Sequence, residues 1–187
     1  MIYIVRHGTT EYNLEGRLQG QIDIPLNEEG MNDALQVAKE LKYIHLDEIY
    51  SSDLIRAHAT AKIIARDHDT GGIIHDRRLR EINLGRWQGH TYSDLRAREP
   101  DYEVFYSNPK AYTGTVPERY NLVIKRIDEF FHELNPIKDV LVVTHGFVIY
   151  WYLKEISYGK LIDPIKNCEI IKFDFKTKEF IRNFENK

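Results

Sequence analysis

The clearest pattern in the chain is a set of short apolar runs separated by amphipathic segments. Residues 2–5 are branched and aromatic, which predicts a short buried strand. Residues 140–143 form a continuous branched run, as in parallel strands that are covered on both faces. Residues 46–50 and 73–75 have the composition of two further strands. Strands that alternate with helical segments indicate an α/β protein with a mainly parallel sheet.

Helical spacing of apolar residues marks the segments between these strands. Asn27 suits the capping position of a first helix, and its apolar stripe is expected at Met31, Ala34, Leu35, Ala38 and Leu41. Residues 51–53 offer a cap for a second helix, whose stripe is Ala57, Ala61, Ile64 and Ala65. A third helix is expected to have Pro117 at its first position and to stop at Asn135-Pro136. A helix over residues 147–155 and a terminal hairpin within residues 169–184 complete the pattern.

Two long polar segments interrupt this order. Residues 9–27 form a loop punctuated by glycine, and loops of this length inside compact domains are usually functional. Residues 77–117 predict loops and short helices over the sheet, with a cap-like segment at about 85–117. Neither a repeat nor an interdomain linker is evident, so residues 1–187 are expected to form a single domain.

Composition and charge exclude several classes of function. A net charge of -3 and a pI near 6.2 argue against general affinity for nucleic acid. Cys168 is the only cysteine, so no intrachain disulfide is possible, and a reducing cytoplasm is the expected location. The longest apolar run, residues 147–153, is far shorter than the ~18 residues of a membrane span. We expect no membrane partner and either a monomer or a homodimer.

Two of the predicted strands end in the same pair of residues. Residues 2–5 lead to Arg6, His7 and Gly8, and residues 140–143 lead through Thr144 to His145 and Gly146. If both strands lie parallel in one sheet, both imidazoles emerge at the same edge, where open α/β sheets bind ligands. A glycine after each histidine allows close approach of a ligand and offers an unobstructed N–H group.

Arg56 adds a cation to this predicted edge. It falls in the first turn of the second helix, where the helix dipole disfavours a positive charge by about 0.3–1 kcal/mol. The preceding strand should bring it to the same crevice as Arg6, His7 and His145. Two guanidinium groups and two imidazoles around one point describe a site for a tetrahedral dianion.

Five motifs carry a wider resemblance. They are Arg6-His7-Gly8-Thr9 with Asn13, Arg17-Leu18-Gln19-Gly20, residues 51–57 with Thr60-Ala61, Leu79-Arg80-Glu81, and Val143-Thr144-His145-Gly146. Their order and residues resemble the histidine phosphatase superfamily, also called the phosphoglycerate mutase-like family, over nearly the whole chain. The resemblance implies a three-layer α/β/α sandwich around a mainly parallel sheet.

The resemblance also implies roles for individual residues. His7 would be the nucleophile that becomes phosphorylated, while Arg6, Arg56 and His145 would hold the phosphoryl oxygens without a metal or other cofactor. Glu81 would protonate the leaving alkoxide and then activate water. Further substrate contacts are expected from Gly8, Asn13, Arg17, Gln19 and Gly146.

Departures from the mutase pattern favour a phosphatase that hydrolyses a small phosphorylated metabolite. Residues 81–89, EINLGRWQG, are similar to the phosphatase branch, with Gln88 where that branch usually has glutamate. Residues 113–118 keep a glutamate but lack the glycine pair common at this position in the branch. Phosphoglycerate mutase-type transfer and a non-catalytic phospholigand-binding protein are the alternatives. The physiological ester is not evident.

Two residue clusters near the cap-like segment have competing interpretations. Arg77, Arg78, Arg80 and Arg86 are interpreted as a rim that draws phosphoesters into the crevice, and not as an RNA-binding surface. Tyr92, Tyr102, Tyr106 and Tyr112 with Phe105 either wall the substrate pocket or pack the cap. The remaining histidines lack metal-ligand spacing and are expected to be solvated: His45, His58, His68, His75, His90 and His132.

Overall fold

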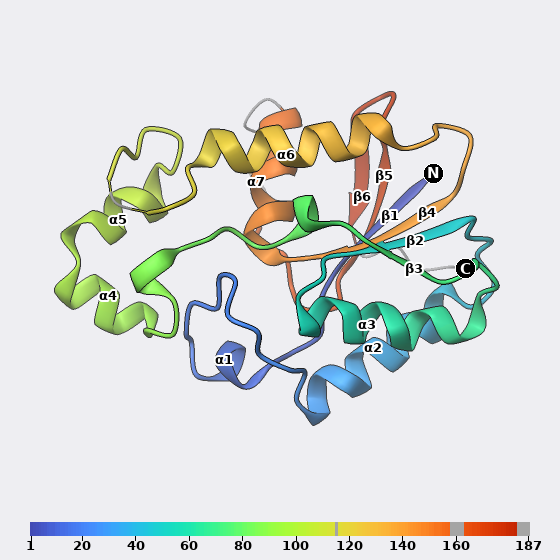
Figure 1. The fold of residues 1–187 in the computed structure, drawn as a ribbon, viewed down its shortest axis with the longest axis horizontal. Coiled ribbons are helices and arrows are strands. Elements are labelled where there is room, and N and C mark those ends of the chain that lie inside the picture. Colours follow the sequence, from blue (N-terminus) through green and yellow to red (C-terminus); the bar gives the residue numbers. More distant parts are fainter. Residues whose placement is uncertain (115, 158–162, 183–187) are drawn as a thin grey trace.

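A central sheet of six strands organises the molecule (Figure 1), which we analysed as a computed structural model describing residues 1–114, 116–157 and 163–182. The strand order is β3-β2-β4-β1-β5-β6. The bounds are β1 Ile2–Arg6, β2 Glu48–Ser51, β3 Ile73–His75, β4 Val140–Thr144, β5 Ile170–Asp174 and β6 Glu179–Arg182. Strands β3, β2, β4 and β1 are mutually parallel, and β5 is antiparallel to both of its neighbours. The α/β class with a mainly parallel sheet is therefore confirmed.

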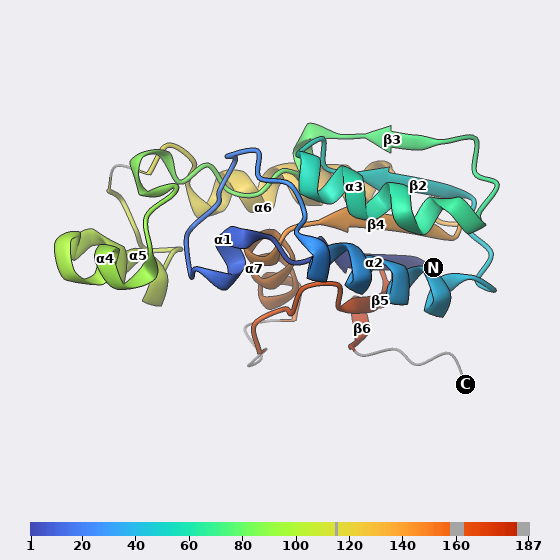
Figure 2. The same ribbon diagram turned by 90° about the horizontal axis from the view of Figure 1, so that it is seen from below.

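Two pairs of helices cover the two faces of the sheet (Figure 2). One face packs against α2 Glu28–Leu41 and α3 Ile55–Ile64, and the other against α6 Tyr120–Glu133 and α7 Gly146–Ile156. The alternation within β1 shows why both faces need cover, because Ile4 belongs to the α6–α7 core while Tyr3 and Val5 belong to the α2–α3 core. The three-layer α/β/α arrangement follows directly from strands that are apolar on both sides.

Several local expectations need correction. Met31 and Leu35 are exposed, and the buried stripe of α2 consists of Gly30, Ala34, Val37, Ala38 and Leu41. The cap of α3 is Leu54, which has no side-chain capping bond, and Asp23 accepts the Ile55 N–H at 2.6 Å instead. Pro117 lies before α6, which begins at Tyr120. The terminal hairpin is present as β5 and β6, and its predicted residues 183 and 184 lie outside the described chain.

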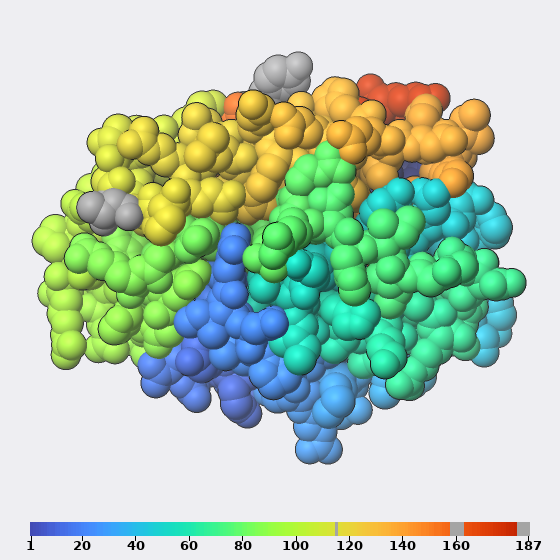
Figure 3. All heavy atoms as spheres, in the orientation of Figure 1, coloured from blue at the N-terminus to red at the C-terminus, as the bar shows by residue number. Residues whose placement is uncertain are grey.

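The predicted cap-like segment lies beyond the carboxyl ends of the parallel strands (Figure 1). It contains α4 Tyr92–Arg98 and α5 Pro100–Ser107, and an aromatic cluster of Trp87, Tyr102, Phe105, Tyr112 and Trp151 fastens it to α7. The loop after β1 includes the short helix α1 Glu11–Leu14 and pairs with the cap through a bridge between Arg17 and Thr91. Figure 3 shows this loop against the segment of residues 76–91 at the surface.

Short 3-10 turns connect the remaining parts, at Ala65–Asp67, Arg77–Leu79 and Gly85–Trp87.

Within the described residues, none of the helices combines the length and the apolar character that crossing a membrane requires.

Candidate active site

The two histidine-glycine pairs meet at one edge of the sheet, as their spacing predicts. Strands β1 and β4 are parallel neighbours with Arg6 opposite Thr144, and the His7 N–H donates to the Thr144 carbonyl at 3.0 Å. This register places the His7 and His145 rings 5.2 Å apart between centroids. The carboxyl ends of two parallel strands thus present both imidazoles to the same space.

The His7 ring is held in one tautomer by its own backbone. Nδ1 lies 2.7 Å from the Gly8 carbonyl oxygen, which can only accept, so Nδ1 carries the hydrogen. Nε2 therefore has the free lone pair, and Arg56 Nε donates to it at 3.2 Å. Burial, then Arg56 and Arg6, lower the pKa of His7 well below its ordinary value, so the ring is neutral at pH 7.

Arg56 is a buried cation that the loop after β1 holds in place. Its Nη1 donates to the Ile22 carbonyl at 2.8 Å and its Nη2 to the Gly20 carbonyl at 2.7 Å. With Nε directed at His7, every nitrogen of the guanidinium group has a partner. Burial lowers the pKa of Arg56 to about 10, so the group remains charged at neutral pH. The carbonyl groups of this loop thus stabilise the positive charge that the helix dipole disfavours in the first turn of α3.

Arg6 approaches the same cavity from the end of β1. Its Nη1 donates to the Ile165 carbonyl at 2.7 Å, while its buried Nε has no partner among the described residues. Gly146 explains how the guanidinium fits, because a Cβ atom at that position would lie 3.2 Å from Arg6 Nε. A larger first residue of α7 would push the Arg6 side chain by a few tenths of an ångström, and one donor of Arg6 lacks a protein partner.

Glu81 is buried. Its sequence context alone would favour an exposed ion pair with Arg78 or Arg80. Its Oε1 accepts the Ile82 N–H at 3.0 Å and its Oε2 accepts the Phe147 N–H at 3.2 Å. Burial raises the pKa of Glu81. The two N–H groups and the charges of Arg56 and Arg6 lower it, but the effect of burial is larger. The site therefore contains a carboxyl group that binds a proton more readily than a glutamate in water.

His145 is buried and bonded on one side only. Its Nε2 lies 2.8 Å from Ser52 Oγ, and its buried Nδ1 has no partner among the described residues. Burial, followed by Arg56 and His7, lowers the pKa of His145 well below the ordinary value. His145 is thus a second neutral imidazole with one ring nitrogen left for a ligand.

A cavity of about 410 Å³ lies against most of these groups, but His145 is not part of its lining and contacts the site through the neighbouring His7 ring. Its described lining includes Arg6, His7, Arg56, Glu81 and Gly146, together with three further predicted contacts, Asn13, Arg17 and Gln19. Arg17 pairs with Glu15 and donates to the Gly89 carbonyl at 2.8 Å. Asn13 Oδ1 accepts from Thr10 at the start of α1.

Gly8 has a different role from the one expected. Its N–H donates to Thr60 Oγ1 at 3.0 Å and is therefore not free for a ligand. A Cβ atom at Gly8 would lie 2.4 Å from the Gly30 carbonyl oxygen. The glycine at this position allows the segment after β1 to pack closely against the start of α2.

A family comparison agrees with this geometry. The model of the histidine phosphatase superfamily (branch 1) matches residues 2–186. The chain belongs to the histidine phosphatase superfamily. It is 38% identical over 181 residues to phosphoglycerate mutase-like protein 4 of Arabidopsis thaliana, covering 92% of this chain and 78% of that one.

Solved structures share the same fold. YhfR of Bacillus stearothermophilus superposes with a TM-score of 0.82 at 33% identity, covering 100% of this chain and 96% of the other. A mycobacterial glucosyl-3-phosphoglycerate phosphatase in complex with VO3 superposes with a TM-score of 0.81 at 27% identity, covering 99% and 98%.

Three residues of this superfamily member were missed by sequence reasoning although they support the site. Ser52 bonds to His145, Thr60 accepts from Gly8, and Asn167 Nδ2 donates to the His7 carbonyl at 2.9 Å and to Asn13 Oδ1 at 3.3 Å. Ser52 and Thr60 lie inside the motif that contains Arg56, which is the one signal available for them. Asn167 has no such signal, because 160 residues separate it from His7.

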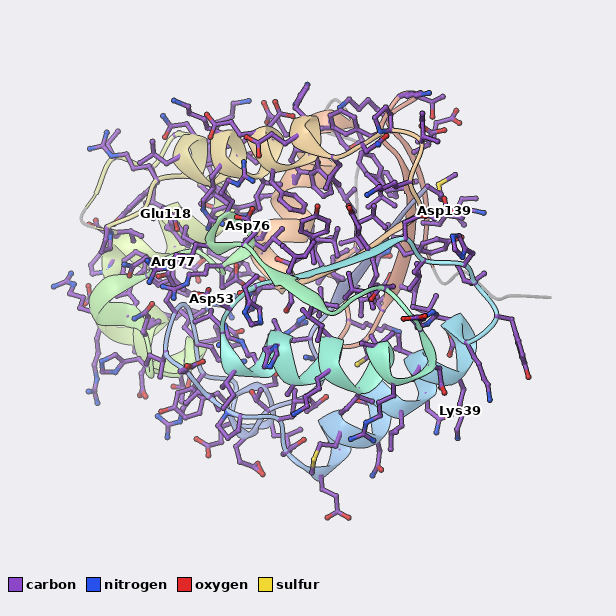
Figure 4. All side chains as sticks on the ribbon, turned by 45° about the vertical axis from the view of Figure 1, so that its right-hand side comes forward. Lys39, Asp53, Asp76, Arg77, Glu118 and Asp139 are labelled. Atoms are coloured by element: carbon purple, nitrogen blue, oxygen red, sulfur yellow. The ribbon has the colours of Figure 1, made fainter. Side chains whose placement is uncertain are left out.

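The four arginines interpreted as a rim are all held in ion pairs. Arg80 pairs with Asp53 at 2.6 Å, Arg78 with Asp76 at 2.7 Å, and Arg86 with Glu99 at 2.5 Å. None of the cluster lines the described cavity. Figure 4 shows Asp53, Asp76 and Arg77 close together where the chain leaves β2 and β3. Arg77 and Arg80 both pair with Asp53 and so tie the chain before Glu81 to the segment after β2.

The aromatic residues divide between the two expected roles. Tyr92 and Tyr106 line the cavity, Phe105 and Tyr112 pack with Trp87 in the cap, and Tyr102 does both. Of the outlying histidines, His58 and His75 are bonded to each other at 2.8 Å. Across the described residues, no group of three or more His, Cys, Asp or Glu side chains is arranged to hold a metal ion.

Proposed function

We propose that this protein hydrolyses a small phosphomonoester through a phosphohistidine intermediate on His7. The observation that carries the proposal is a neutral imidazole whose unprotonated Nε2 accepts a hydrogen bond from Arg56, in a cavity that also holds Glu81. A neutral nitrogen nucleophile, a fixed cation and a carboxyl group with a raised pKa are the groups that phosphoryl transfer to and from a histidine uses.

In the first step, His7 Nε2 attacks phosphorus and the bond from phosphorus to the ester oxygen breaks. Arg6 and Arg56 stabilise the equatorial oxygens, and the Nδ1–H bond to the Gly8 carbonyl supports the positive charge that develops on the imidazole. Glu81 donates its proton to the departing alkoxide. The products of this step are an alcohol, phosphorylated His7 and the Glu81 carboxylate.

In the second step, water attacks the phosphorus of phospho-His7. The Glu81 carboxylate accepts the proton from water, the bond between nitrogen and phosphorus breaks, and inorganic phosphate leaves. His7 then returns to its neutral form and Glu81 to its protonated form. Protein cations supply the charge stabilisation in both steps, so the proposed mechanism uses neither a metal nor an organic cofactor.

Names among the comparisons support both hydrolysis and transfer. One structural relative is named a glucosyl-3-phosphoglycerate phosphatase, and one sequence relative is named phosphoglycerate mutase-like. A mutase would return the phosphoryl group from His7 to a second position of the bound intermediate. Incubation with 3-phosphoglycerate separates the two, since a phosphatase releases inorganic phosphate and a mutase forms the isomeric ester.

The test of the proposal compares His7→Asn with His90→Asn, in which the replaced histidine is exposed. We expect the wild-type enzyme and His90→Asn to release phosphate from a panel of phosphomonoesters in the presence of a chelator. We expect His7→Asn to release none and to incorporate no phosphoryl group. Undiminished turnover by His7→Asn would refute the proposed nucleophile, and multiple turnover by wild type would eliminate a purely ligand-binding function.

A further inference from the structure

The cavity has two chemically different parts. Its inner part holds the charged and titratable groups Arg6, His7, Arg56 and Glu81. Its outer part is walled mainly by aromatic residues from the cap and from α7: Tyr92, Tyr102, Tyr106, Phe147, Tyr150 and Trp151. A phosphoryl group bound at His7 would place the alcohol part of the ester against this aromatic wall. That wall therefore selects among substrates.

Cations in the outer part already have anionic partners. Arg96 Nε pairs with Glu103 Oε1 at 2.7 Å, and its guanidinium group lies 5.6 Å from the centroid of the Tyr106 ring. Arg17 is paired with Glu15 and bonded to the Gly89 carbonyl. Of the described residues that line the cavity, these are the only cations besides Arg6 and Arg56.

This arrangement has opposite effects on two kinds of leaving group. A carboxylate on the alcohol part would have to compete with Glu103 or Glu15 for a cation and would lose its hydration beside aromatic rings. An uncharged ring would keep both ion pairs intact and gain contact area and ring stacking. The cavity volume of about 410 Å³ is within the usual range for small-molecule sites, so a phosphoryl group and a ring fit together.

We propose, on the basis of the proposed phosphatase function, that the preferred substrate is a phosphomonoester of an uncharged, ring-bearing alcohol. Glu103 is the specificity-determining residue, because its ion pair with Arg96 disfavours esters that carry a second anionic group. Glu103 acts through Arg96 and does not touch the reacting atoms.

Three esters with benzylic alkoxide leaving groups test this specificity: benzyl phosphate and the size-matched pair 4-carbamoylbenzyl phosphate and 4-carboxybenzyl phosphate. The amide and the carboxylate differ in charge and hardly in shape. For the wild-type enzyme we expect kcat/KM to be at least tenfold higher for the carbamoyl ester than for the carboxy ester. Glycerol 2-phosphate, which is uncharged but has no ring, should have a lower kcat/KM than benzyl phosphate.

Glu103→Gln should remove the ion pair of Arg96 and reduce the preference for the carbamoyl ester over the carboxy ester. Exposed ion pairs make small contributions, so the ratio of the two kcat/KM values should shift about 1.4-fold to fivefold toward the carboxy ester. The double variant Glu103→Gln with Arg96→Gln should lose the shift. Asp101→Asn is the matched control, because it removes one negative charge from the exposed side of the same helix without touching Arg96.

The possible outcomes separate this inference from the proposed function. If none of the esters is hydrolysed, the phosphatase function itself is wrong. If they are hydrolysed but the carboxy ester is preferred by wild type, or Glu103→Gln shifts the ratio no more than Asp101→Asn, the specificity proposal is overturned while the phosphatase function stands.

Discussion

Glu81→Gln provides a direct test of the proposed acid, because substrates differ in how much they need its proton. A benzyl alkoxide is a poor leaving group that requires protonation, whereas 4-nitrophenolate leaves without it. General acid catalysis contributes about 10²–10⁴-fold. At ~1.36 kcal/mol for each factor of ten, this is about 3–5 kcal/mol. We expect a loss of this size in kcat/KM for benzyl phosphate and a much smaller loss for 4-nitrophenyl phosphate.

The structure also sets the stability cost of this change. The Glu81 carboxyl accepts from both Ile82 and Phe147, and a glutamine amide has one oxygen for these two N–H groups. One buried donor would lose its acceptor, at about 1–3 kcal/mol of unfolding free energy. Thermal unfolding must therefore show that Glu81→Gln is folded at the assay temperature before its kinetics are interpreted.

Rapid mixing with 4-nitrophenyl phosphate then distinguishes the two steps. The variant should release nitrophenol in a burst close to the enzyme concentration and turn over slowly afterwards, because water attack on phospho-His7 lacks its base. His7→Asn is the control and should show no burst. If Glu81→Gln slows the first release of nitrophenol as strongly as that of benzyl alcohol, Glu81 is not the general acid.

Three further outcomes follow from the same geometry. The folded pKa values of His7 and His145 are lowered from 6.5, so the unfolding free energy should fall as pH drops below 6.5, by up to ~1.4 kcal/mol per pH unit for each group. Denaturant titrations at several pH values should show that the unfolding free energy of His145→Gln depends less steeply on pH than that of wild type. Gly8→Ala should lower stability by ~1–3 kcal/mol in the same titrations, since its Cβ would overlap the Gly30 carbonyl. Arg56→Lys should reduce kcat/KM about 10–100-fold in steady-state assays, because one ammonium group cannot bond to two carbonyls and a phosphoryl oxygen in the guanidinium geometry.

Local sequence signals were sufficient to predict the main strands of the sheet and the helices between them. The apolar runs at residues 2–5 and 140–143 predict strands because a strand covered on both faces has apolar residues at successive positions. Once these strands are parallel neighbours, their shared geometry brings His7 and His145 together. The resemblance to the family added Glu81, which composition and periodicity alone would have left at the surface.

Contacts between distant segments determined the rest. Asp23 rather than a neighbouring residue accepts from the start of α3, and Asn167 reaches the His7 carbonyl across the fold. Asp53, read as a helix cap, is instead the ion-pair partner of Arg80. Local spacing carries no information about such pairs, because it reflects which face of an element is apolar and not which other element lies opposite. The protonation preferences of His7 and Glu81 likewise arise only when burial and the two arginines surround them.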